Sequence, residues 1–110
     1  MRLLLKANDL AETKLYYRTQ LGFSVRDSVE ATCTVEIQGQ ALIFTESALW
    51  EGGPKLTGTV YFFIDEITAY YESVKSSASV VWPLEEMSYG TREFGVRDCN
   101  GYLLAFSQRI

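Results

Sequence analysis

The sequence predicts an α+β fold made of two tandem β-α-β-β-β modules. Short apolar runs typical of strands flank two segments with helical periodicity, and this order of elements occurs twice. Leu10, Tyr17 and Leu21 share one face of a first helix, and residues 67, 74 and 78 repeat that spacing 57 positions later. Such a repeat indicates an internal duplication. We therefore expect one domain over residues 1–110, with repeats at about 1–46 and 58–110 and a linker at 47–57.

The first module is expected to contain a strand, a helix and three further strands. Asp9 and Glu12 have capping-box spacing, which predicts the start of the helix. Gly22 suits the left-handed residue that follows a helix, and Gln38-Gly39 predicts a tight turn. The strands are expected at residues 2–7, 23–27, 31–37 and 41–45.

The second module is expected to repeat the first. Asp65 is predicted to cap its helix, and Pro83 to end the strand that follows. Gly39 aligns with Gly101 at an offset of 62, so we expect the five additional residues in the loop at 85–90. The strands are expected at residues 59–64, 80–82, 92–98 and 102–106.

The linker contains Leu49 and Trp50, which are unusual residues for a loop. They either pack on the core as a tether or cover a pocket as a lid.

Composition excludes several functional classes. A net charge of −4 disfavours nucleic acid, and no apolar run is long enough to span a membrane. The chain enters a strand directly at its start, so we expect no signal peptide, and two isolated cysteines favour a reduced, cytoplasmic protein. There is no histidine, which removes the commonest metal ligand and the commonest general base at neutral pH.

The closing hairpin carries a resemblance to a known family. Its motif residues are Tyr89-Gly90, Arg92-Glu93-Phe94, Arg97-Asp98 and Gly101, with Cys99 at the position of the usual proline. This pattern resembles the vicinal oxygen chelate superfamily of glyoxalases, extradiol dioxygenases and bleomycin-resistance proteins, and the bleomycin-resistance branch most of all. The resemblance covers nearly the whole chain and implies curled mixed sheets around a cavity.

Metal ligands in that superfamily lie on the first and last strands of each module. The corresponding positions here are Arg2, Ile43, Thr59 and Ala105. Isoleucine and alanine supply no donor and arginine repels a cation, so we expect no bound metal and no cofactor.

Strand alternation then predicts which side chains face the cavity. Thr59, Tyr61 and Phe63 share one face with Ile43, Leu103 and Ala105, where small residues beside large aromatics leave room for a flat apolar molecule. The alternative is that Tyr61 and Phe63 fill the space themselves.

Glu93 precedes the core residue Phe94 on the predicted strand, so its side chain points to the opposite face and is expected to face the same cavity. It meets either a cationic ligand group or an arginine, namely Arg92, Arg97 or Arg2. Tyr89 occupies a position where bleomycin-resistance proteins often have tryptophan, which implies stacking at the cavity mouth. The predicted ligand-binding set is Glu93, Tyr61, Phe63, Tyr89, Thr59, Ile43, Ala105, Leu103 and Trp50.

These observations favour a metal-free protein that binds a small apolar or aromatic, cationic molecule, like antibiotic-sequestering relatives. No catalytic residue is predicted. The alternatives are a glyoxalase-like lyase or isomerase, and a structural or interaction module with a filled cavity. The resemblance also implies a homodimer.

Overall fold

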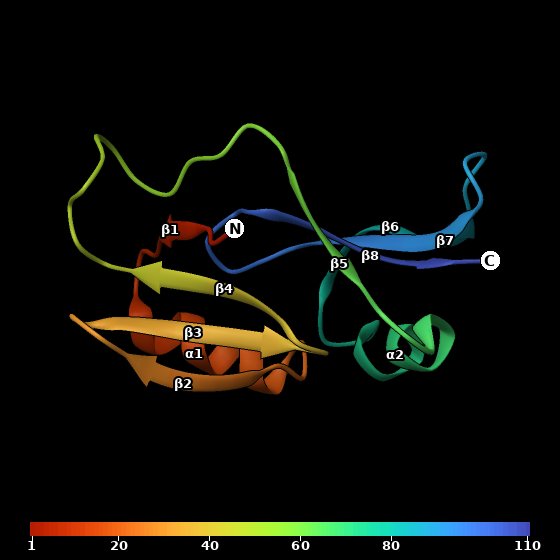
Figure 1. Ribbon diagram of the computed structural model, residues 1–110, viewed down its shortest axis with the longest axis horizontal. Coiled ribbons are helices and arrows are strands. Elements are labelled where there is room, and N and C mark those ends of the chain that lie inside the picture. Colours follow the sequence, from red (N-terminus) through yellow and green to blue (C-terminus); the bar gives the residue numbers. More distant parts are fainter.

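A computed structural model describes all 110 residues and contains the two predicted modules (Figure 1). The first module is β1 (Leu4–Lys6), α1 (Leu10–Thr19), β2 (Ser24–Ser28), β3 (Thr32–Ile37) and β4 (Gln40–Thr45). The second is β5 (Thr59–Phe63), α2 (Ile67–Val74), β6 (Ser79–Glu86), β7 (Thr91–Arg97) and β8 (Leu103–Arg109). No helix or strand lies between β4 and β5. Neither helix is long and apolar enough to cross a membrane.

Each module forms one mixed four-stranded sheet, in the orders β1-β4-β3-β2 and β5-β8-β7-β6. The duplication extends to the register. Leu4 pairs with Ile43 in the parallel β1–β4 pair, and Tyr61 pairs with Ala105 in the parallel β5–β8 pair. The predicted offsets are therefore confirmed: 57 residues from β1 to β5 and 62 residues from β4 to β8. Thr34 and Gly95 occupy equivalent places on β3 and β7 with an offset of 61, so one additional residue lies in the closing turn and not at 85–90.

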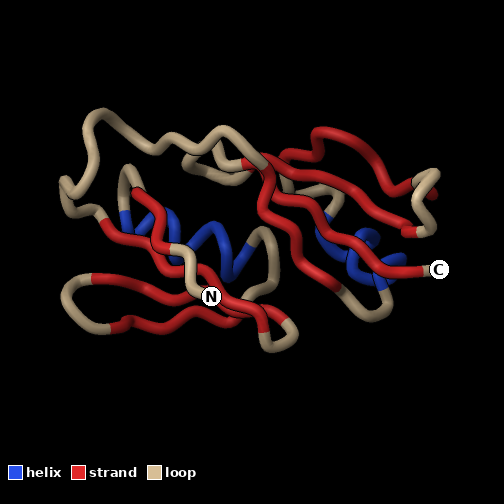
Figure 2. The backbone as a smooth tube through the Cα atoms, turned by 45° about the horizontal axis from the view of Figure 1, so that its top comes forward, coloured by secondary structure: helices blue, strands red, loops and turns tan.

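Each helix covers one face of its own sheet, and the opposite face is called the open face below (Figure 2). The predicted alternation is confirmed, because Leu42, Phe44, Leu104 and Phe106 are buried in the core between helices and sheets. Aromatic rings join the two modules there. The Phe23 ring lies 5.3 Å from that of Phe62 and 6.2 Å from that of Phe106, so the modules share one core.

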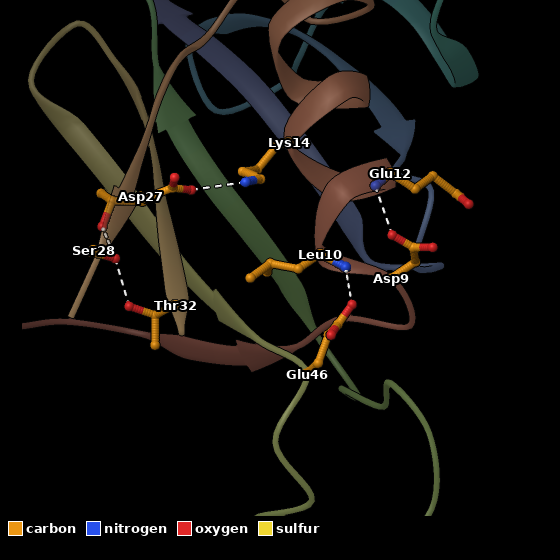
Figure 3. Close-up of polar contacts among 9 residues, drawn as sticks. Asp9, Leu10, Glu12, Lys14, Asp27, Ser28, Thr32 and Glu46 are labelled. Carbon is orange, nitrogen blue, oxygen red and sulfur yellow. Dashed lines mark hydrogen bonds and ion pairs between the residues drawn. The ribbon is translucent and has the colours of Figure 1, made fainter. Parts of the chain in front are cut away.

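The first helix begins as predicted. The Asp9 carboxylate accepts a hydrogen bond of 2.9 Å from the backbone N–H of Glu12 (Figure 3), and Gly22 has a φ of +72°. The second helix does not begin as predicted. Its cap position is Glu66, in a left-handed conformation, and the side chain of Gln108, not that of Asp65, accepts a hydrogen bond from the backbone N–H of Ile67.

Pro83 does not end its strand, since β6 continues to Glu86. This is tolerated because β6 lies at the edge of the sheet and its register shifts on both sides of Trp82. Proline is compatible with an edge strand or a bulge, where no ladder hydrogen bond needs its missing N–H.

Candidate functional site

The open face of the C-terminal sheet brings together most of the predicted ligand-binding residues. Two rows of paired residues cross it. One row runs from Tyr61 through Ala105 and Gly95 to Trp82. The neighbouring row runs from Phe63 through Ser107 and Glu93 to Glu85. In the first row, the small residues between them separate Tyr61 on β5 from Trp82 on β6. These two strands are three strand spacings, or roughly 14 Å, apart.

Glu93 is the most unusual residue on this face. Its side chain belongs to β7 and is only 2% exposed. None of the three arginines considered as partners binds it. Arg92 pairs with Glu86 at 3.1 Å, Arg97 donates to the backbone oxygen of Gly101, and Arg2 makes no ion pair. A buried carboxylate without a cation is costly, because buried charges are normally paired.

Tyr89 supplies the only hydrogen bond to this carboxylate. The tyrosine hydroxyl donates to Glu93 Oε1 over 2.7 Å, across the loop between β6 and β7. This hydrogen bond, assisted by the negative charge of Glu93, raises the pKa of Tyr89 to about 12. Tyr61 lies close enough to contribute to the same rise. The carboxylate and the two phenols therefore form one cluster, and the Tyr89 ring remains largely exposed.

Trp82 is a member of this face that the sequence reasoning did not find. Its indole ring lies flat on Gly95, so that a Cβ placed on Gly95 would come within 2.4 Å of the ring. Regular alternation would put Trp82 on the same face as Val80 and Leu84, which pack on the core. The register shifts around Trp82 turn it to the other face. A glycine opposite a tryptophan was the only signal in the sequence.

The remaining predicted residues are distributed more widely. Phe63 and Ser107 line a cavity of about 470 Å³ at the end of the C-terminal sheet, whereas Thr59 and Leu103 pair at its other end. Tyr61 and Phe63 are 48% and 68% exposed, so they do not fill a core. Ile43 lies on the N-terminal sheet, and Trp50 lines a separate cavity of about 300 Å³ beside β1.

The residues at the four positions implied for a metal do not fit a metal ion. Ile43 and Ala105 carry no donor atom, Thr59 offers one hydroxyl, and Arg2 is a cation. The structure gathers no group of three or more histidine, cysteine, aspartate or glutamate side chains that would hold a metal ion. Both cysteines are free.

Two tandem β-α-β-β-β modules with open sheet faces define the class of fold that glyoxalases and bleomycin-resistance proteins share. The sequence model of the Glyoxalase/Bleomycin resistance protein/Dioxygenase superfamily matches residues 2–106. The chain belongs to this superfamily. No curated protein matches it significantly.

Solved structures show the same fold at low sequence identity. TioX from Micromonospora sp. ML1 is 18% identical, with a TM-score of 0.79, and the match covers 100% of this chain and 95% of that one. A glyoxalase/bleomycin resistance protein/dioxygenase from Alicyclobacillus acidocaldarius is 19% identical, with a TM-score of 0.79 and coverage of 100% and 90%. A virulence protein from Salmonella typhimurium is 19% identical, with a TM-score of 0.76 and coverage of 99% and 94%.

Proposed function

We propose that this protein binds a small aromatic or apolar cation on the open face of the C-terminal sheet, without a metal and without making or breaking a bond. The role resembles that of antibiotic-sequestering proteins of the same superfamily. The observation that carries the proposal is Glu93, a carboxylate buried on an open face with no cation of the protein beside it. A ligand cation would supply the missing partner.

The aromatic side chains around Glu93 support the same ligand class. Tyr61, Tyr89 and Phe63 offer exposed rings, and Trp82 adds an indole held flat against β7. Ring faces attract cations and stack on flat molecules. An aromatic cation would use both the charge of Glu93 and these rings, whereas a neutral molecule would leave the carboxylate unpaired.

We also propose that the protein acts as a cytoplasmic homodimer. The outer edges of β1 and β5 pair with no strand of their own chain, and large apolar side chains lie exposed near β1, including Leu4, Trp50 and Leu56. Unpaired edges beside exposed apolar groups are typical of surfaces that a second chain covers. The free cysteines fit a reducing compartment.

Thermal unfolding in the presence of ethidium, a planar aromatic cation, tests the binding proposal. A ligand at a hundred times its dissociation constant should add about 2.7 kcal/mol to the free energy of unfolding. We expect Glu93→Gln to weaken ethidium binding by roughly tenfold or more, because it removes a charge-assisted contact. Glu12→Gln removes the same charge from the exposed start of α1 and should leave binding unchanged.

Two results would contradict the proposal. One is that the Glu93→Gln variant binds ethidium as tightly as the wild-type protein does, and that the wild-type protein shows no saturable binding of other aromatic cations. The other is a stoichiometric divalent metal that stays with the purified protein through dialysis, which would favour a glyoxalase-like enzyme.

A further inference from the structure

A cavity larger than those lined by Phe63 and by Trp50 lies on the other sheet. It measures about 860 Å³ and is formed by the open face of the N-terminal sheet and the segments that border it. Of the nine residues predicted to bind a ligand, only Ile43 belongs to it. Its volume falls in the range of small-molecule sites.

Hydroxyl groups from three strands form the floor of this cavity. Ser28, Thr32 and Thr45 lie side by side in one row across β2, β3 and β4, and Thr34 lies in the next row between Arg26 and Ile43. Thr34 and Thr45 are 6% and 2% exposed. Buried polar groups on a sheet face are costly unless they find partners, so the floor is built for polar contacts.

The hydrogen bonds among these hydroxyls run in one direction. Thr32 donates its proton to the backbone oxygen of Val29 over 2.6 Å. Each hydroxyl has only one proton, so Ser28 donates in the 2.6 Å contact with Thr32, which Figure 3 shows, and Thr34 donates to Ser28 over 3.2 Å. All three protons are used, and both lone pairs of Thr34 Oγ1 stay free. At Thr34 the floor therefore accepts hydrogen bonds from a ligand donor.

Charged side chains of both signs border the same floor. Arg26 lies beside Thr34 on β2, and Glu36 follows Thr34 by two residues on β3, on the same face. Arg2 and Glu30 also line the cavity. None of these four takes part in an ion pair, since the three ion pairs of the protein involve other residues. Two cations and two anions are thus available at one cavity.

We propose that this cavity binds a small zwitterion of amino-acid or short-peptide size, with a free ammonium and a free carboxylate. The ammonium would donate to Thr34 Oγ1 and pair with Glu36, and the carboxylate would pair with the guanidinium of Arg26. Ile43 continues the Thr34 row and offers apolar contact to the rest of the ligand.

A zwitterion fits this surface better than the other classes of ligand. A simple anion would face two glutamates, and the cation proposed for the C-terminal sheet would face two arginines. A neutral sugar would satisfy the hydroxyls and leave all four charges without partners. The site is on a different sheet from Glu93, so it adds a second specificity to the protein.

Amide chemical shifts measured by NMR, with leucyl-leucine as the probe, test this proposal. We expect saturable shifts in β2, β3 and β4, and not in β7 or β8. The doubly blocked peptide N-acetyl-leucyl-leucine amide has neither charge and should bind roughly tenfold or more weakly. Arg26→Gln and Glu36→Gln should each weaken the binding of leucyl-leucine to a similar extent, because each removes one charged partner of the ligand. Both residues are exposed, so we expect the variants to fold normally.

Matched controls separate this site from the rest of the molecule. Arg18→Gln and Glu12→Gln remove the same charges from α1 and should leave the affinity for leucyl-leucine unchanged. Glu93→Gln should also leave it unchanged, so either site can fail alone. Equal binding of the free and blocked peptides, shifts confined to β5–β8, or no saturable shift in the millimolar range would overturn the proposal.

Discussion

At the scale of single residues, the candidate site depends on side chains that local sequence rules place poorly. Glu93 was predicted to face a cavity; it lies on the open face of its sheet, but it lines none of the three cavities described above. Whether it met an arginine was left open, because arginine reach depends on tertiary packing. The structure shows that Arg92 and Arg97 bind elsewhere. The buried carboxylate of Glu93 is therefore left without a cation of the protein.

Gly95 provides a test of the contact that holds Trp82 against β7. A Cβ at this position would lie within 2.4–2.5 Å of three ring carbons of Trp82, so Gly95→Ala must displace the indole. We expect a loss of about 1–3 kcal/mol in the free energy of unfolding, typical of overpacking, together with weaker ethidium binding. Urea denaturation and fluorescence titration measure the two effects.

Gly53→Ala is the control for that substitution. Its added Cβ would come no nearer than 4.0 Å to another group, so the change should stay within about 0.5 kcal/mol. Unchanged stability and unchanged binding in Gly95→Ala would show that the position of Trp82 is not fixed by this contact.

At the scale of elements, the β7–β8 turn holds the two modules together. The Asp98 carboxylate accepts hydrogen bonds from Tyr17 Oη on α1 at 2.6 Å and from the backbone N–H groups of Asn100 and Tyr102 at 2.9 and 2.8 Å. The carboxyl is buried, and this burial raises its pKa above the ordinary value of 3.8, although the hydrogen bonds oppose the rise.

This raised pKa predicts a pH dependence with a definite sign. The native state holds the Asp98 proton more tightly than the unfolded chain does. The contribution of this group to stability is therefore complete below pH 3.8 and is lost as the pH rises through the raised native pKa. Asparagine does not ionise, so Asp98→Asn should gain stability relative to wild type over that interval, as measured by urea denaturation across the acidic range.

Asp65→Asn is the charge-matched control, because Asp65 is exposed and its side chain makes no hydrogen bond. Parallel stability curves for Asp98→Asn and wild type from pH 3.8 to neutrality would contradict the predicted linkage.

At the scale of the whole molecule, the open faces and free edges predict self-association. Part of the β5 edge is covered within the chain. The side-chain amide of Gln40 accepts a hydrogen bond from the backbone N–H of Phe63 at 2.7 Å and donates one to its backbone oxygen at 2.6 Å. The side-chain amide of Gln38 makes the same two hydrogen bonds with the backbone of Asp65. On β1 the backbone oxygen of Lys6 accepts a hydrogen bond of 2.7 Å from the Tyr102 hydroxyl, whereas no strand pairs with the outer side of β1 at Leu4. This edge is the part of the surface that we expect a second chain to pair with.

Leu4 is the residue that tests this expectation. It lies on β1 with its side chain 37% exposed. We expect Leu4→Glu to shift a dimer toward monomer in sedimentation equilibrium, since a charge would be buried at the interface. Leu15→Glu introduces the same charge at an exposed position of α1 and should leave the assembly unchanged. A wild-type protein that sediments as a monomer at high micromolar concentration would refute the homodimer.

The sequence by itself determined the α+β class, the duplication, the start of α1 and the side chains that build the core. These follow from local periodicity and from a repeat along the chain, which need no knowledge of distant contacts. Only the tertiary structure decided that Gln108 and not Asp65 caps α2 and that Trp82 turns to the open face. It also decided that no arginine binds Glu93 and that a cavity of about 860 Å³ lies on the N-terminal sheet. Each depends on a bulge or on contacts between residues far apart in the chain, where one shifted residue moves a side chain to the other face.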